Sequence, residues 1–284
     1  MGTPKIGMSF LMWTPEFREE HLPLLDQLRD MGFDGVELPL VDTSFEMLER
    51  AAMRCEELGL ERTGVGFATA EADPISPDPL VRMKAVAHIE ELCRKADVLG
   101  APLLGGPIHS AYATFSGVGP QEEQLKRSAD VLARAAETAA SLGVRLGLEY
   151  LNRFECYLVT SAAETEALVK RVGHPSLCTV LDTHHSHIED SEVGQAIRGC
   201  AETLGHVQLS ESHRGFLGQG QVHWGSVFDA LADIHYDDWL IIEAFSRHDP
   251  EFAAGLHIWR DPATDLMDIP RRGLAFVRRH LGLA

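Results

Sequence analysis

The chain has 284 residues, 45% of them hydrophobic, and a formal net charge of −18 at pH 7 that comes from 25 basic and 43 acidic side chains. This length suits a single (β/α)8 barrel, which typically needs about 250 residues, and the hydrophobic fraction is sufficient for a large core. The excess of negative charge repels phosphate backbones and argues against nucleic-acid binding as the main function.

The cysteines and the N-terminal residues indicate the compartment. The five cysteines include no CxxC pair, so they do not form a disulfide framework, and they fit a reducing cytoplasm. The first residues contain one lysine and a short apolar run, unlike a signal peptide. No apolar stretch approaches the roughly 20 residues of a membrane span. We therefore expect a cytoplasmic protein without a membrane partner.

Short β-rich runs alternate with longer amphipathic runs along the chain, and several of the latter end on glycine, as helix C-caps do. In chain order the predicted elements are strand Lys5–Phe10, helix Phe17–Met31, strand Asp34–Leu38, helix Ser44–Leu58, strand Glu61–Phe67, helix Pro79–Leu99, strand Pro102–Pro107, helix Gln121–Leu142, strand Val144–Glu149, helix Ala162–Val172, strand Leu177–Asp182, helix Glu189–Thr203, strand Gly205–Leu209, helix Trp224–Ile234, strand Trp239–Glu243 and helix Ile269–Leu281.

Eight repeated strand–helix units in a chain of this length predict a single-domain TIM barrel over residues 1–284. The structural alternative is a doubly wound open sheet. That alternative is weakened because no glycine-rich phosphate loop follows the first strand, where the sequence reads Ser9-Phe10-Leu11-Met12-Trp13.

Polar side chains end several of the apolar strands in the second half of the chain. Glu149, Asp182 and Glu243 end the fifth, sixth and eighth strands, and Gln208 lies on the seventh. Strand ends meet at one face of a barrel, so these side chains are expected to converge. A helix cap or a salt bridge is the alternative for any one of them. Four oxygen-bearing ligands predict a hard divalent cation such as Mg²⁺ or Mn²⁺ and do not favour zinc.

Histidines near these strand ends are further candidates. His185 follows Asp182 on what we expect to be a loop at the active face, and His184 or His187 are alternatives for the same role. Most of the fourteen histidines must be structural or exposed, as we expect for His223 and His235, which directly flank the predicted helix Trp224–Ile234.

The segments LEYLNRFE, LDTHHSHIED, HVQLSESHRGFLGQG and IIEAFS together resemble the D-tagatose and D-allulose 3-epimerases, a family of ketose 3-epimerases. Weaker matches, among them ELPL and IWRD, extend the resemblance over nearly the whole chain. The resemblance implies a TIM barrel of the xylose isomerase-like superfamily, a divalent metal, commonly manganese or cobalt, and a homodimer or homotetramer.

The same resemblance implies roles for individual residues. Glu149 and Glu243 match residues that are both metal ligands and the two catalytic bases, and Asp182 matches a further ligand. The remaining matches, which hold the O1 and O2 end of the substrate, are Glu155, His185 and Arg214.

The chain departs from the family at the metal ligand on the seventh strand. The family usually has a histidine there, whereas this sequence has Gln208 within His206-Val207-Gln208. A glutamine oxygen can serve as a neutral ligand in place of an imidazole nitrogen. His206 points to the same side but lies two residues deeper, so we assign it to the core.

The expected chemistry is proton removal from C3 by one glutamate, an enediolate, and proton return from the opposite face by the other. An aldose–ketose isomerase similar to hydroxypyruvate isomerase, or a sugar dehydratase, would use the same barrel and metal. An apurinic endonuclease would need more histidines at strand ends, and a catalytically inactive sugar-binding protein would not need both glutamates.

The substrate is expected to be a free sugar. The loop after the eighth strand offers Arg247 beside acidic residues, and the glycines after the seventh strand, Gly215, Gly218 and Gly220, offer an alternative anion site. The predicted apolar walls of the pocket are Trp13, Phe67, Phe216, Phe245 and Trp259.

Overall fold

Eight short runs that are buried along nearly their whole length form a closed parallel barrel in the computed structural model, which describes residues 2–283. The strands are β1 (Lys5–Ser9), β2 (Gly35–Pro39), β3 (Glu61–Val65), β4 (Leu103–Gly106), β5 (Arg145–Glu149), β6 (Leu177–Asp182), β7 (Leu204–Ser210) and β8 (Trp239–Glu243). Pairing of β1 with β8, with Ile6 opposite Leu240, closes the ring. The predicted TIM barrel is confirmed, and the open sheet is excluded.

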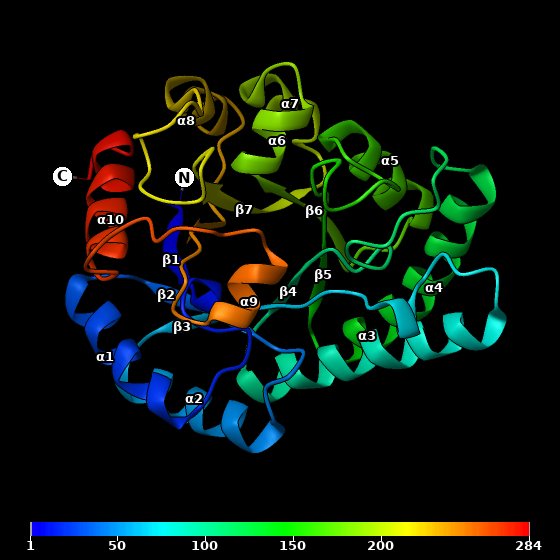
Figure 1. Cartoon of the computed structure of the whole chain (residues 1–284), viewed down its shortest axis with the longest axis horizontal. Helices are drawn as coiled ribbons and strands as arrows, with labels where there is room; N and C mark the ends of the chain where they lie inside the picture. The colour runs from blue at the N-terminus through cyan, green and yellow to red at the C-terminus, as the bar shows by residue number, and fades with distance from the viewer. Residues whose placement is uncertain (1, 284) are drawn as a thin grey trace.

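The helices surround the strands in chain order, so each strand is covered on its outer side (Figure 1). They are α1 (Leu22–Met31), α2 (Phe45–Leu58), α3 (Pro79–Leu99), α4 (Glu122–Ser141), α5 (Ala162–Val172), α6 (Thr183–Glu189), α7 (Val193–Gly199), α8 (Trp224–Asp233), α9 (Pro250–Gly255) and α10 (Asp268–His280). Short 3-10 helices lie at Phe10–Met12, Glu19–His21 and Ala70–Ala72. Because helices cover the barrel outside and side chains fill it inside, strands such as WLIIE are apolar on both faces.

The helix α2 shows how the sequence specifies these elements. Ser44 caps its N-terminus by accepting a hydrogen bond from the main-chain N–H of Met47, and Gly59 ends it in the left-handed conformation. Its buried residues recur every three or four positions, so one stripe faces the barrel.

The region after β6 differs from its prediction. The predicted helix Glu189–Thr203 is present but shorter, as α7, and the prediction missed α6, which begins directly after β6. Asp182 caps α6 by accepting from the N–H groups of His184 and His185. Glu192 caps α7 in the same way, which starts a new helix and separates the two. His185 therefore lies in the first turn of α6 and not on a loop. The helix α9 was not predicted.

All five cysteines are buried and unpaired, as their number and spacing predicted. Within residues 2–283, no helix combines the length and the apolar character needed to cross a bilayer.

Gly106, at the end of β4, is the position where the barrel most clearly requires glycine. Its φ is +127°, and a Cβ atom there would lie 2.0 Å from the carbonyl oxygen of Gly66. We expect Gly106→Ala to lower the free energy of unfolding by about 2 kcal/mol or more, measured by urea denaturation. The neighbouring Gly105→Ala is the control, because its Cβ would meet nothing closer than 3.5 Å. Equal losses in the two variants would contradict this account.

Candidate active site

The carboxyl ends of four consecutive strands bring the predicted site residues together. Glu149 ends β5, Asp182 ends β6 and Glu243 ends β8, while Gln208 lies on β7 opposite Asp182. All four residues are at most 4% exposed. Their convergence follows from the closed barrel, since neighbouring parallel strands end at the same face.

The guanidinium of Arg214 lies among these carboxylates. Its Nη1 donates to Asp182 Oδ2 at 3.1 Å and to Glu243 Oε2 at 2.6 Å, and its Nη2 lies 4.0 Å from Glu155 Oε1. The backbone of Arg214 is left-handed, with φ +60°, and its carbonyl accepts from the N–H of Phe245. The guanidinium also packs against the ring of Phe245, with Arg214 Cζ 4.9 Å from the centroid of that ring. A strained backbone that neighbouring groups hold in place is typical of a functional position.

Burial and mutual repulsion dominate the electrostatics of the two glutamates. Burial raises the pKa of Glu149 well above its usual value, and the charge of Asp182 raises it further. Burial likewise raises the pKa of Glu243, with Arg214 opposing and Asp182 adding to the effect. Burial works against the charge of Arg214, but Asp182 and Glu243 outweigh it, so its pKa is raised. The site therefore holds more negative charge than Arg214 alone compensates.

Hydrogen bonds from Asn152 determine which nitrogen of His185 carries hydrogen. The main-chain N–H of Asn152 donates to His185 Nδ1 at 3.0 Å. Burial, together with the charge of Arg214, holds the pKa of His185 well below its usual value, so the ring is neutral. Its hydrogen is then on Nε2, which lies 3.0 Å from Arg214 Nη2 and 3.6 Å from Glu149 Oε1. His185 and Arg214 can thus donate to one oxygen atom placed between them.

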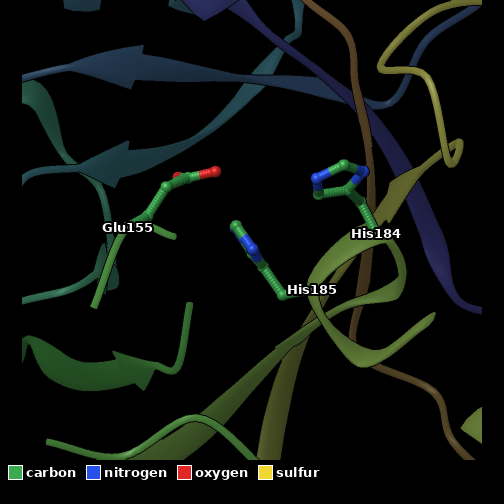
Figure 2. A group of neighbouring side chains, drawn as sticks. All are labelled: Glu155, His184 and His185. Atoms are coloured by element: carbon green, nitrogen blue, oxygen red, sulfur yellow. The ribbon is translucent and has the colours of Figure 1, made fainter. Parts of the chain in front are cut away.

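The half-buried Glu155 faces His185 across the site, with His184 on the other side of that ring (Figure 2). The side-chain amide of Asn152 donates to Glu155 Oε1 at 2.8 Å. Burial lowers the pKa of His184 to about 2, and its Nδ1 lies 3.2 Å from the carbonyl oxygen of Glu211. Of the candidate histidines, His185 is the one that borders the cavity, while His223 is exposed at the start of α8.

Among residues 2–283, two groups of three potential ligands have ligand atoms that all lie within 4.8 Å of one another. One is Glu149, Asp182 and His185, and the other is Glu155, His184 and His185. Both include His185, but its Nδ1 already accepts from Asn152 and its Nε2 carries hydrogen. We therefore favour oxygen ligands over His185 for a cation.

Gln208 offers such an oxygen. Its Nε2 donates to Glu37 Oε1 at 3.1 Å and lies 3.4 Å from Glu243 Oε1. Among the described residues, its Oε1 has no hydrogen-bond partner although it is buried. Gln208 thus offers an unpartnered buried acceptor from β7, the strand between those that Asp182 and Glu243 end, and this fits a divalent cation that takes oxygen ligands.

A cavity of about 530 Å³ opens above these groups and is bordered by Glu149, Glu155, His185, Arg214 and Glu243. Of the five predicted aromatic walls, Phe67 and Phe245 border it. The prediction was wrong for the other three: Trp13 is in the core beside Phe10, Phe216 packs against Arg272, and Trp259 is 68% exposed.

The helix α9 supplies the missing part of the wall. It lies in front of the strands near the centre of the ring (Figure 1), and Phe252 from this helix and Leu256 directly after it border the cavity. No sequence periodicity marked this short helix. The charged residues around the cavity are mostly acidic, namely Glu16, Asp42, Asp249 and Glu251, against Arg18, whose guanidinium is paired with Glu16. Arg247 is exposed and does not border the cavity.

The loop after β7 is organised by the buried carboxylate of Glu211. It accepts from the main-chain N–H groups of Ser212, Gly218 and Val222 and from Trp224 Nε1, at 2.8 to 3.1 Å. A Cβ at Gly220 would lie 2.4 Å from Glu211 Oε1. Of the glycine amides that sequence analysis offered as an anion site, that of Gly218 donates to this carboxylate and that of Gly215 donates to His213 Nδ1. Sequence analysis missed this role, as it missed those of Asn152 and Glu37.

Comparisons with known proteins agree with this architecture. The family described as "Xylose isomerase-like TIM barrel" matches residues 25–268. An L-ribulose 3-epimerase of Mesorhizobium japonicum is 34% identical over 96% of this chain and 93% of its own length. A ketose 3-epimerase of Arthrobacter globiformis is 34% identical over 98% of this chain and 96% of its own. The structure of a D-allulose 3-epimerase from Methylomonas sp. in complex with D-allulose superimposes with a TM-score of 0.91 at 26% identity, covering 99% of this chain and 98% of that one.

The pH dependence of stability tests the assigned role of Glu211. Burial alone would raise its pKa, but its N–H donors outweigh burial and lower it. A carboxyl whose pKa is lower in the folded than in the unfolded chain stabilises the fold at pH values above its unfolded pKa of about 4.3. This stabilisation is lost as the pH falls from there through the pKa of the folded state. We expect Glu211→Gln to lose about 1–3 kcal/mol at pH 7, and thermal unfolding should show this difference persisting down to about pH 4.3 and shrinking as the pH falls further. Exposed Glu123→Gln is the control. A loss that is constant with pH would contradict the assignment.

Proposed function

The chain belongs to the xylose isomerase-like TIM barrel family, and from that premise we propose that it is a metal-dependent ketose 3-epimerase acting on free ketoses. The observation that carries the proposal is a pair of buried glutamates, Glu149 and Glu243, on strands three apart around the barrel and bordering one cavity. Inversion of a carbon centre needs a base on each side of it, and an isomerase that works on one face does not.

The proposed ligands of the cation are Glu149, Asp182, Gln208 and Glu243. When bound, a divalent cation supplies Lewis acidity to the oxygens of the substrate. Manganese, with cobalt or magnesium as substitutes, belongs to the proposal through the family resemblance. The excess of buried carboxylates and the free Oε1 of Gln208 support it.

In the proposed reaction one glutamate takes the proton from C3 and the other returns a proton to the opposite face. Without a cation the raised pKa values favour the protonated form of both carboxylates, and a bound cation would favour the charged form that accepts a proton. His185 Nε2 and Arg214 Nη2 would donate to the substrate oxygen at C2 and stabilise the charge that develops there. Glu155, held by Asn152, would accept from a substrate hydroxyl.

The proposed substrates are free ketopentoses and ketohexoses such as L-ribulose and D-allulose, the sugars in the names of the relatives above. We also propose a cytoplasmic homodimer or homotetramer, on the family resemblance alone.

The proposal is tested by following free ketoses by NMR in D₂O with metal-stripped enzyme, before and after Mn²⁺ is added. We expect deuterium at C3, inversion of that centre, and activity only with the metal. Exchange at C1 or C2 would instead indicate an aldose–ketose isomerase, and loss of water would indicate a dehydratase.

The two-base scheme predicts the effect of conservative variants in the same assay. Glu149→Gln and Glu243→Gln should each lower turnover by about 10²–10⁴-fold, because each amide can no longer accept the proton. Glu123→Gln changes an exposed glutamate in the same way and should leave turnover unchanged. Retention of more than roughly a tenth of the activity by either buried variant would contradict the scheme.

Charge around the cavity predicts a preference for unphosphorylated sugars. The acidic residues at its edge repel a terminal phosphate, and the amides of Gly218 and Val222 after β7 already donate to Glu211. We expect kcat/KM for D-allulose to exceed that for its terminal phosphate by at least about tenfold, the factor that corresponds to about 1.4 kcal/mol of unfavourable interaction. Faster turnover of the phosphate ester would contradict this prediction.

A further inference from the structure

A second buried polar group lies inside the barrel beneath the proposed cation site. It consists of Glu37 on β2, Thr63 on β3, and His206 and Gln208 on β7, each at most 1% exposed. Alternation along the strands turns these side chains inwards, where parallel barrels usually place apolar residues. A buried charge at such a position is unfavourable unless hydrogen bonds compensate it, and the carboxylate of Glu37 has such bonds.

Both oxygens of Glu37 are used, and for different partners. Oε1 accepts from Gln208 Nε2 at 3.1 Å. Oε2 accepts from His206 Nε2 at 2.9 Å and, more weakly, from Thr63 Oγ1 at 3.4 Å. His206 and Thr63 thus hold one side of the carboxylate and leave the other to Gln208.

The contact with Glu37 matters because the two ends of a glutamine amide are nearly the same in shape. Either end of Gln208 could face the strand ends, but an NH₂ group there would repel a cation, whereas the oxygen would bind it. A carboxylate only accepts hydrogen bonds, so Glu37 requires the NH₂ group on its own side. Glu243 Oε1, 3.4 Å from the same nitrogen, favours the same orientation. Oε1 of Gln208 is then left without a partner among the described residues.

We propose that Glu37 is a positioning residue that orients the amide of Gln208 so that its oxygen faces the cation. This inference rests on the cation site of the proposed function. The amide of Gln208 is neutral and could present either end to a cation. The hydrogen bond to the buried carboxylate of Glu37 fixes its orientation, so that it can serve as a ligand on β7. Glu37 itself does not border the cavity.

Direct binding of Mn²⁺ to metal-stripped protein, followed by the EPR signal of free Mn²⁺, tests the proposal without an activity assay. Glu37→Gln has nearly the same shape but offers a donor as well as an acceptor, so it no longer selects one orientation of Gln208. We expect the Kd for Mn²⁺ to rise about 10–100-fold, the usual effect of losing a partner that orients a ligand. Thr63→Val is the matched control, because it removes a contact to Glu37 but none to Gln208, and it should change Kd by less than about twofold.

A double-mutant cycle separates positioning from a general loss of structure. In a Gln208→Ala background there is no amide to orient, so adding Glu37→Gln should raise Kd by less than about threefold. Where Glu37→Gln fails to fold, judged by thermal unfolding, Glu37→Asp withdraws the carboxylate by one methylene and enters the same cycle. An equal rise in Kd in both backgrounds, or no rise in either, overturns the proposal. Absence of Mn²⁺ binding by the wild-type protein would instead count against the cation site and the proposed function.

Discussion

The guanidinium of Arg214 lies between Asp182 and Glu243 at a place where the barrel collects buried carboxylates. Strand ends that meet at one face bring these acids together, and burial makes each uncompensated charge expensive. Other groups of the site hold the compensating positive charge of Arg214 in position. The left-handed backbone at Arg214, its bond to the N–H of Phe245 and the loop that leads to it all keep this one positive charge in place.

Residues of one chemical type acquire three different roles through their surroundings. Glu211 is surrounded by N–H donors that lower its pKa, and it shapes a loop. Glu37 is held by side chains and faces the amide of Gln208. Glu149 and Glu243 have raised pKa values because burial and neighbouring acids outweigh the effect of Arg214. Of these four residues Glu149 and Glu243 border the cavity, and the proposed function assigns the proton transfers to them.

The cavity divides into a polar floor and a largely apolar upper wall. At the floor, Asn152 fixes His185 so that a donor points at the space shared with Arg214. Higher up, Phe67, Phe245 and Phe252 offer apolar surface, and after β7 the amide of Gly218 already donates to Glu211. In the proposed reaction such a site binds the reacting end of a sugar through polar groups and makes few hydrogen bonds to the rest of the molecule.

The sequence alone determined the barrel, the eight strands to within two residues at their ends, and the acids that end β5, β6 and β8. These features are local in sequence. They are apolar strand-like runs that alternate with amphipathic runs, glycines that end helices, and polar residues at the ends of apolar strands. It did not determine that Asp182 caps a helix, that Asn152 sets the hydrogen on His185, or that α9 walls the cavity in place of Trp13, Phe216 and Trp259. The bond from Gln208 to Glu37 joins residues 171 positions apart. Such contacts arise only when the ring closes, because closure decides which inward-facing side chains meet, and no local pattern records that.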